Sequence, residues 1–299
     1  MDKTNFKFID LFSGIGGFHY GLAKLGGECV MASDIDVIAC KTYEQNYGIT
    51  PRGDIHKIKS GDIPDFDILC GGFPCQAFSV IGPQGGFNDP RGQLIFEVFR
   101  ILKDKQPKAF ILENVKGLLY HDDGRTAKLI FDELDKCGYD VSHKVLEAKD
   151  YGLPQIRKRL FIVGTRKDLK ANFIFPEPTG CQVLLGDILG GKTNRDYAFT
   201  IRIGGRNSGI DNKYNWDSYY VDGKVHTITP EECLQVQGFP KDFKLAGNKD
   251  QQYKQVGNSV PTTVVQVIGR ELIKPLIKVH SKHIFCRINN ILWFESCPL

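Results

Sequence analysis

Short apolar runs alternate with amphipathic segments along the first half of the chain. The runs predict buried strands at 6–12, 29–33, 66–69, 109–113, 141–146 and 160–164. The segments between them predict helices at 17–25, 37–46, 94–105 and 126–137, the second of them capped by Asp36. This alternation is typical of a doubly wound α/β sheet with helices on both faces.

The pattern changes after about residue 167, where short runs are separated by Gly, Asn, Pro and Asp, as in 204–209. We interpret this part as a smaller, loop-rich second domain. A helical pattern returns at 261–274, with Ser259 as its expected cap. The expected division is one domain at 1–166 plus 255–279, a second at 167–254, and a tail at 280–299 whose role stays open.

Composition narrows the class of protein. The 299 residues are 41% hydrophobic and 25% charged, which is ordinary for a globular chain of one or two domains. The nine cysteines are odd in number and form no C-x-x-C pair, so we expect neither a disulfide framework nor a metal site. Neither a signal-peptide core nor a membrane-spanning apolar stretch is evident, so we expect a cytoplasmic protein without membrane contact. The net charge of +4 permits nucleic-acid binding without requiring it.

A cysteine follows the third predicted strand, in the segment CGGFPCQAFS at 70–79. Open α/β sheets carry their chemistry at the carboxyl ends of strands. Gly71 and Gly72 are expected to turn the backbone, and Pro74 fixes φ just before Cys75. We therefore predict a reactive thiol at Cys75, against the alternative of a small buried hydrophobe, and we assign Cys70 to the core.

A glycine-rich segment, DLFSGIGG at 10–17, joins the first strand to the first helix. Its glycines allow a ligand to approach backbone amides and a helix N-terminus. Asp34 ends the second strand twenty residues after Gly14, where a carboxylate can accept hydrogen bonds from ribose hydroxyls. The two features favour an adenosine-containing ligand, with a tight turn and a capping Asp as the alternative.

Five motifs occur in order: FSGIGG at 12–17, GFPCQ at 72–76, ENV at 113–115, QIRKR at 155–159 and QVGNSVP at 255–261. Together they resemble the bacterial DNA (cytosine-5) methyltransferases of type II restriction–modification systems, closely over 6–165 and 226–275. The resemblance implies a Rossmann-like methyltransferase sheet with a target-recognition domain. It also implies methyl transfer from S-adenosyl-L-methionine to a cytosine flipped out of a short double-stranded DNA sequence, which protects that DNA from a cognate restriction endonuclease.

The resemblance implies catalytic roles for four residues. The thiolate of Cys75 attacks carbon 6 of the cytosine, and Glu113 stabilises the proton on ring nitrogen 3. Arg159 holds the carbonyl oxygen of the base, and Arg157 supports the same pocket from the same strand face. Asn114 is expected to order the neighbouring loop.

The resemblance also implies binding residues. The cofactor set is Phe12, Gly14, Ile15, Gly16, Gly17, Asp34, Ile35, Asp54, Ile55, Pro74, Leu94, Asn258, Ser259 and Val260. Within it, Phe12 stacks on the adenine and Asp54 accepts from the adenine amino group. The DNA-binding set, assigned mainly from side-chain type and position, is Gln76, Ser79, Ile81, Arg91, Thr200, Arg202 and Arg206. For the segment that carries the last two, a solvated glycine-rich loop is the alternative. The glycine-rich segment 80–92 is expected to be a lid over DNA, with Ile81 as an apolar wedge.

Three alternatives remain: a tRNA-directed relative, a catalytically inactive DNA-binding scaffold, and a thiol hydrolase. The GFPC sequence favours duplex DNA over tRNA, and the presence of Cys75, Glu113 and Arg159 argues against an inactive scaffold. No His stands in a motif that would pair it with the thiol. We expect a monomer and an inert Cys233, and the DNA sequence that is read stays open.

Overall fold

The computed structural model describes residues 6–74, 94–180, 183–204 and 206–289, with side chains to residue 276. Five predicted site residues, Cys75, Gln76, Ser79, Ile81 and Arg91, lie outside the described residues, as does the whole of the expected lid at 80–92. The bounds below therefore refer to these ranges.

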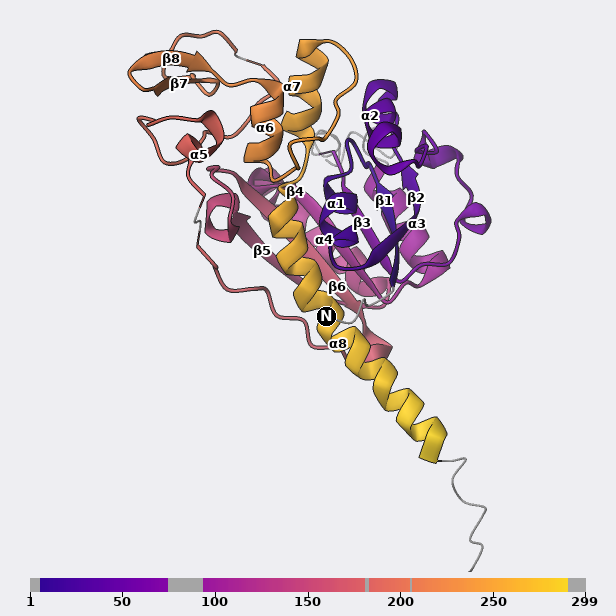
Figure 1. Ribbon diagram of the computed structural model, residues 1–299. Helices are drawn as coiled ribbons and strands as arrows, with labels where there is room; N and C mark the ends of the chain where they lie inside the picture. The colour runs from indigo at the N-terminus through magenta and orange to yellow at the C-terminus, as the bar shows by residue number, and fades with distance from the viewer. Residues whose placement is uncertain (1–5, 75–93, 181–182, 205, 290–299) are drawn as a thin grey trace, which may run out of the picture.

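A six-stranded sheet forms the centre of the described chain (Figure 1). Its strands are β1 Phe6–Leu11, β2 Gly27–Ser33, β3 Ile68–Gly72, β4 Ala109–Val115, β5 Tyr139–Glu147 and β6 Lys158–Arg166. Their order across the sheet is β2-β1-β3-β4-β6-β5. β2, β1, β3 and β4 are parallel, while β6 is antiparallel to both β4 and β5. The predicted α/β fold class is confirmed.

Helices cover both faces of the sheet. One face carries α1 Gly17–Ala23, α2 Val37–Tyr47 and α8 Thr262–Asn289, and the other carries α3 Leu94–Lys105 and α4 Arg125–Lys136. Short 3-10 turns lie at Ile55–Lys57, Ser60–Asp62, Lys116–Gly124, Ala148–Tyr151 and Lys167–Leu169. Figure 1 shows α8 crossing the sheet and then running out beyond the body of the protein.

The sheet has an apolar core on each face, which explains why its strands are continuous apolar runs in the sequence. In β1, Ile9 and Leu11 enter the core under α3 and α4, whereas Phe8 enters the core under α1 and α8. All three side chains are fully buried. Alternate residues therefore point to opposite faces and both faces are covered, as expected for a parallel sheet.

The region expected to form the second domain packs around a third apolar cluster, which Ile15 also joins. The region contains α5 Leu185–Leu189, β7 Ser218–Val221, β8 Lys224–Thr227, α6 Pro230–Val236 and α7 Lys249–Asn258. Trp216, Tyr219 and Tyr253 are nearly completely buried in it. The expected domain boundary at residue 255 falls inside α7, so a division at that point would cut through one helix.

Two local predictions were wrong. Gly71 and Gly72 do not turn the chain but end β3, where they pair with Leu112 and Glu113 of β4. Ser259 does not cap the last helix: it is the C-cap residue of α7, and α8 begins at Thr262. In both cases the residue type matters at that position, but for a different reason from the one predicted. The glycines end a strand rather than form a turn, and the serine ends one helix rather than begins the next.

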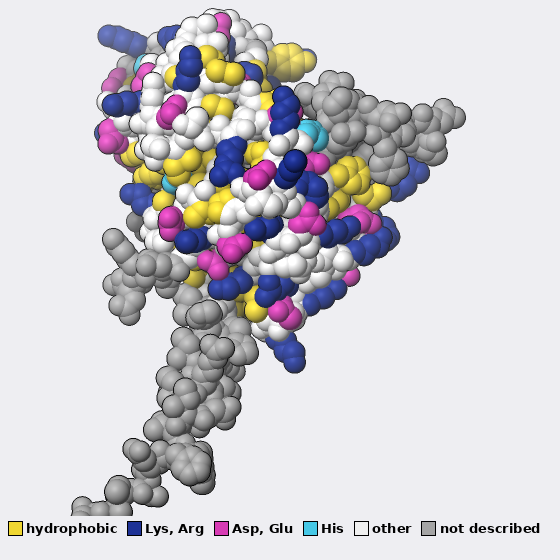
Figure 2. Space-filling model, turned by 90° about the vertical axis from the view of Figure 1, so that its right-hand side faces the viewer, with side chains coloured by type: hydrophobic (Ala, Val, Ile, Leu, Met, Phe, Trp, Pro, Cys, Tyr) yellow, Lys and Arg dark blue, Asp and Glu magenta, His cyan; other side chains and the backbone are white. Residues whose placement is uncertain are grey.

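The surface mixes charges of both signs. On the face shown in Figure 2, Lys and Arg side chains are interspersed with Asp and Glu side chains rather than gathered in a single patch. In the part of the chain that the structure describes, none of the helices combines the length and apolar character needed to cross a membrane.

Candidate active site

The loop after β1 has an unusual backbone. Phe12 has φ 54°, and Gly14 and Gly16 have φ 52° and 81°, all in the left-handed region. Such a conformation costs energy at a bulky residue such as Phe12 and is found disproportionately at ligand sites. Gly16 is also the N-cap residue of α1, so this loop sets where the helix begins.

A cavity of about 100 Å³ lies at the carboxyl ends of β1, β2 and β3. Its walls are Phe12, Ser33, Asp34, Ile35, Gly53, Asp54, Ile55, Pro74 and Leu94. Apart from Ser33 and Gly53, every one of these residues was predicted from the sequence to bind a cofactor. The structure thus brings together residues from three strand ends and from the first turn of α3.

A second cavity, of about 30 Å³, shares Phe12 with the first. Its walls are Phe12, Ser13, Gly14, Gly17, Phe18, Gly72, Glu113, Asn258, Ser259 and Val260. Because Phe12 lines both cavities, the two spaces adjoin at its ring. The predicted cofactor residues of the N- and C-terminal segments therefore meet beside the predicted catalytic Glu113.

Two carboxylates of the first cavity are held in different ways. Asp34 accepts hydrogen bonds from the backbone N–H of Gly14 (2.7 Å) and of Asp36 (2.8 Å). Burial raises its pKa. Asp54 lies 2.8 Å from the imidazole Nδ1 of His56, and this hydrogen bond lowers the pKa of Asp54. A carboxylate has about four lone-pair sites, so each can still accept from a ligand.

The second cavity depends on a close approach of the chain to itself. A Cβ atom at Gly17 would lie 2.7 Å from Val260 Cγ1 and 2.8 Å from Ser259 Oγ, so only glycine fits there. The predicted neighbours Ile15 and Gly16 line neither cavity. The Ile15 side chain is fully buried in the third apolar cluster, and its contact with the cofactor stays a prediction.

An ion pair joins β4 to β6 at the end of the sheet. Arg159 Nε lies 2.9 Å from Glu113 Oε1, and the two side chains are only 14% and 13% exposed. Burial raises the pKa of Glu113, although the neighbouring arginines oppose this effect. Glu113 Oε2 would lie 3.2 Å from a Cβ atom at Gly72, which explains why the strand facing it ends in glycine.

Asn114 ties the end of β3 to β4. Its buried side-chain amide donates to the carbonyl of Phe73 (2.9 Å), and its side-chain oxygen accepts from the backbone N–H of Val115 (2.8 Å). Phe73 stands two residues before Cys75 in the chain. Asn114 therefore fixes the backbone from which the cysteine segment departs.

The predicted placement of Arg157 needs correction. It lies one residue before β6 rather than within the strand, and it is 1% exposed. Its guanidinium donates to the carbonyls of Gly257 and Ser259 (2.8 Å each) and of Ile201 (3.4 Å). Through these hydrogen bonds, the buried guanidinium of Arg157 connects the start of β6 to residue 201 and to the segment around Asn258.

Comparison with known proteins agrees with this geometry. The family model described as C-5 cytosine-specific DNA methylase matches residues 6–208 and 193–274. Type II methyltransferase M.DsaV of Dactylococcopsis salina is 40% identical over 307 residues, which cover 91% of this chain and 87% of that protein. Type II methyltransferase M.HhaI of Haemophilus parahaemolyticus is 37% identical, over 89% of this chain and 94% of that protein.

The chain belongs to the C-5 cytosine-specific DNA methylases. It is an enzyme, a DNA cytosine-5 methyltransferase, as the five sequence motifs predicted. Among solved structures, the Entamoeba histolytica methyltransferase EhMeth superposes with a TM-score of 0.72 at 19% identity and covers 91% of this chain and 99% of that one. The S. pombe Dnmt2 methyltransferase gives 0.71 at 21% identity with the same coverage. At these identities the structures support the fold alone.

The structure describes three of the residues predicted to bind DNA. All three lie in the region expected to form the second domain of the methyltransferase. The hydroxyl of Thr200 donates to the carbonyl of Ile156 (2.6 Å), so it helps to join the two domains. Arg202 is exposed, and its backbone lies 3.3 Å from where a Cβ atom of Gly257 would be. Arg206 lines a groove against α7. A role in DNA binding stays a prediction for Thr200, Arg202 and Arg206.

The sequence analysis missed α6 and α7 of the methyltransferase, and with them Asp250, Tyr253 and Lys254. Each helix begins with a capping box. Thr229 and Glu232 exchange hydrogen bonds at the start of α6, and Asn248 and Gln251 do so at the start of α7. The sequence patterns T-P-E-E at 229–232 and N-K-D-Q at 248–251 are the signals that could have revealed both helices.

Proposed function

We propose that this methyltransferase uses S-adenosylmethionine to methylate carbon 5 of a cytosine that is flipped out of duplex DNA. The observation that carries the proposal is the pair of cavities that share Phe12. One is lined by residues predicted to bind an adenosine, and the other is lined by Glu113, which pairs with Arg159. Cofactor and base would then meet across one aromatic ring.

The residues present fit this cofactor. Asp34 and Asp54 can accept hydrogen bonds from ribose hydroxyls and from the adenine amino group, and Phe12, Ile35 and Leu94 provide apolar walls for the ring. The Gly14–Gly17 backbone at the start of α1 suits the charged methionine end. When bound, the cofactor supplies an electrophilic methyl group.

The proposed chemistry uses Cys75 as the nucleophile. Its thiolate forms a C–S bond to carbon 6 of the cytosine, and the ring electron pair displaced by this attack makes carbon 5 nucleophilic. Carbon 5 then takes the methyl group. Loss of the carbon 5 proton to solvent expels the thiolate, restores the aromatic ring and returns the enzyme to its starting state.

Glu113 and Arg159 activate the base in this proposal. The raised pKa of Glu113 favours a protonated carboxyl that donates to ring nitrogen 3, which draws electrons from carbon 6. Arg159 supplies a charge-assisted donor to the neighbouring carbonyl oxygen. Both groups lie at the end of the sheet where the cysteine segment begins, and Asn114 holds that segment.

The biological role proposed is the protection of DNA from a cognate restriction endonuclease. M.DsaV and M.HhaI are named as type II methyltransferases, and they match most of this chain. The endonuclease would be a functional partner that recognises the same sequence, without a physical complex. We propose that the enzyme acts as a cytoplasmic monomer.

Bisulfite sequencing of duplex DNA tests the proposal. Purified protein, Cys75→Ala and the control Cys137→Ala, which alters a thiol at the end of α4, are incubated with unmethylated DNA and S-adenosylmethionine. We expect 5-methylcytosine at one short motif with the first and third proteins and none with Cys75→Ala. Retained cofactor binding without DNA methylation would indicate the inactive scaffold, and label transfer to tRNA instead would indicate the RNA-directed relative.

A further inference from the structure

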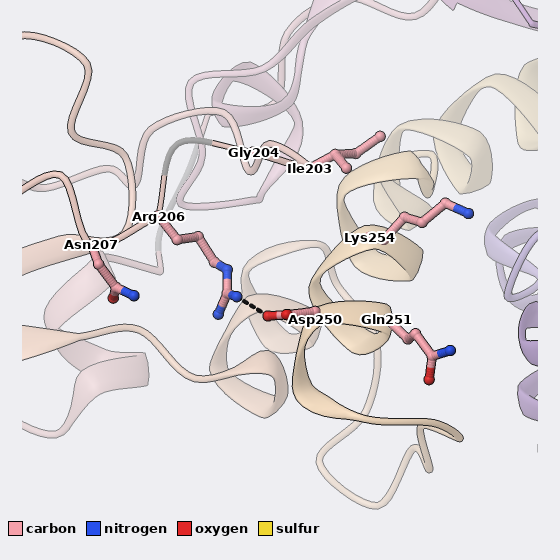
Figure 3. A pocket seen from close by; sticks show the side chains of 7 residues that line it. All are labelled: Ile203, Gly204, Arg206, Asn207, Asp250, Gln251 and Lys254. Carbon is pink, nitrogen blue, oxygen red and sulfur yellow. Dashed lines mark hydrogen bonds and ion pairs between the residues drawn. The ribbon is translucent and has the colours of Figure 1, made fainter.

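A groove distinct from the two cavities lies between α7 and the residues 203, 204, 206 and 207 (Figure 3). It encloses about 460 Å³, and its described walls are Ile203, Gly204, Arg206, Asn207, Asp250, Gln251 and Lys254. The walls carry two cationic side chains, two amides and one carboxylate, beside Ile203 and Gly204. A groove of this size and polarity suits the edge of a nucleic acid better than a small apolar ligand.

Arg206 is held in this groove from two sides. Its guanidinium forms an ion pair with Asp250 on the first turn of α7, and Figure 3 shows it reaching from the loop toward that carboxylate. The guanidinium carbon also lies 4.3 Å from the centroid of the Tyr253 ring. The Arg206 side chain is 22% exposed, so part of its donor edge still faces the groove.

The loop that carries Arg206 is anchored to buried residues. Trp216 Nε1 donates to the carbonyl of Gly204 (2.9 Å), and the Asp217 carboxylate accepts from the backbone N–H of Asn207 (2.9 Å). Both Trp216 and Asp217 are fully buried. The arginine is therefore oriented before any ligand arrives, which reduces the entropy lost on binding.

The carboxylate beside Arg206 indicates which part of DNA it meets. A phosphate contact needs positive charge, and Asp250 offsets that charge and repels phosphates. A base contact needs orientation, because arginine reads guanine by placing two parallel donors on O6 and N7. An arginine that is both compensated in charge and fixed in plane is suited to the base.

The position of the groove limits which base is read. α7 carries Asp250 in its first turn and ends at Asn258, which lines the second cavity. At about 1.5 Å per residue, these eight steps span about 12 Å. With about 3.4 Å between successive base pairs, a distance of this length along the DNA spans at most about four base pairs.

We infer that Arg206 reads a guanine within about four base pairs of the target cytosine, and that Asp250 positions its guanidinium. This inference rests on the proposed function, since it identifies part of the DNA sequence that the same enzyme recognises. Asp250 is a positioning residue, because it acts through Arg206.

Methylation of a duplex pool with randomised bases around the target cytosine tests the inference. The proteins are the wild type, Arg206→Ala, Asp250→Asn and the control Lys249→Ala, an exposed cation on the same turn of α7. We expect the wild type and the control to require guanine at one position. In Arg206→Ala that preference falls about 5- to 150-fold, as for the loss of one bidentate contact, and in Asp250→Asn it falls in the same direction.

Other outcomes overturn the inference in distinct ways. A uniform loss of methylation over all sequences in Arg206→Ala, with a smaller salt slope, would assign Arg206 to a phosphate. A lower melting temperature in Asp250→Asn with unchanged base preference would reduce Asp250 to a structural role. Absence of methylation by the wild type on every sequence would refute the proposed function itself. If Arg206→Ala does not fold, Arg206→Lys, which keeps the charge but loses the bidentate fork, gives the same comparison.

Discussion

Replacing Gly17 by Ala tests how closely the cofactor site depends on chain packing. The added Cβ would lie 2.7 Å from Val260 Cγ1, 2.8 Å from Ser259 Oγ and 2.9 Å from the Val260 carbonyl oxygen. Ordinary van der Waals contact begins at 3.4 Å, so the Ser259–Val260 segment must move by up to about 0.7 Å. One of the three contacts is backbone, so a side-chain rotation does not relieve it.

The expected loss of stability is modest. Overpacking of this kind costs about 1–3 kcal/mol, and alanine regains about 1 kcal/mol of helix propensity at the start of α1. The net destabilisation is therefore at most about 2 kcal/mol. At about 2.1 cal/mol/K of unfolding entropy per residue, this corresponds to a fall of at most about 3 °C in melting temperature for the 299 residues.

The loss of cofactor affinity should be the larger effect. Gly17, Ser259 and Val260 line the same small cavity, so the displacement falls directly on the site. We expect the Kd for S-adenosylmethionine to rise at least tenfold, which corresponds to about 1.4 kcal/mol. Titration calorimetry and thermal unfolding measure the two quantities on the same sample.

Gly61→Ala is the matched control. A Cβ atom at Gly61 would meet no atom within 4 Å, and its φ is not positive, so the same chemical change adds no contact. Wild-type cofactor affinity in Gly17→Ala would refute the reasoning. So would an equal loss of affinity in Gly61→Ala, because the effect would then not come from the Val260 contact.

Three further changes probe the active site and its support. Glu113→Gln keeps an acceptor for Arg159 but removes the proton donor, so initial rates of label transfer to DNA should fall about 10²–10⁴-fold; a rate within threefold of wild type would contradict this. Asn114→Ala leaves the Phe73 carbonyl without its donor, and chemical denaturation should show a loss of about 1–3 kcal/mol together with reduced methylation and unchanged cofactor affinity. Burial lowers the pKa of His19 from 6.5 to about 4, so the unfolded chain takes up that proton first and wild-type stability falls as the pH drops from about 6.5 to 4. His19→Asn should remove up to about 3 kcal/mol of this decline, and parallel unfolding curves at each pH check it.

The sheet could be predicted because its signals are local and repeated. Apolar runs such as 109–113 are buried on both faces, and no other structure accommodates such runs so readily between amphipathic helices. Where the prediction was wrong, the cause was contact between distant segments. Gly71 is glycine because the Leu11 carbonyl would lie 2.8 Å from its Cβ, and nothing in the sequence around residue 71 shows that neighbour.

The cofactor residues were predicted through the resemblance of short motifs, and the structure explains why these motifs are short. Asp34, Asp54 and Leu94 each follow or begin a secondary-structure element at the same edge of the sheet, so each needs only its own few residues to be placed. Arg157 shows the limit of this reasoning. Its three carbonyl partners come from positions 201, 257 and 259, and only the fold brings them together.

The residues proposed to take part in DNA recognition were harder to predict, because their positions depend on how α7 packs against the rest of the chain. This helix carries Asp250 at its start and Asn258 at its end, and Lys254 between them forms a 2.8 Å ion pair with Asp36. The backbone N–H of Asp36 in turn donates to Asp34, at the cofactor cavity. One rigid helix thus contacts the groove, the second cavity and the edge of the first. A shift of α7 on DNA binding would reach all three, so altered base preference in Asp250→Asn should be measured together with cofactor affinity.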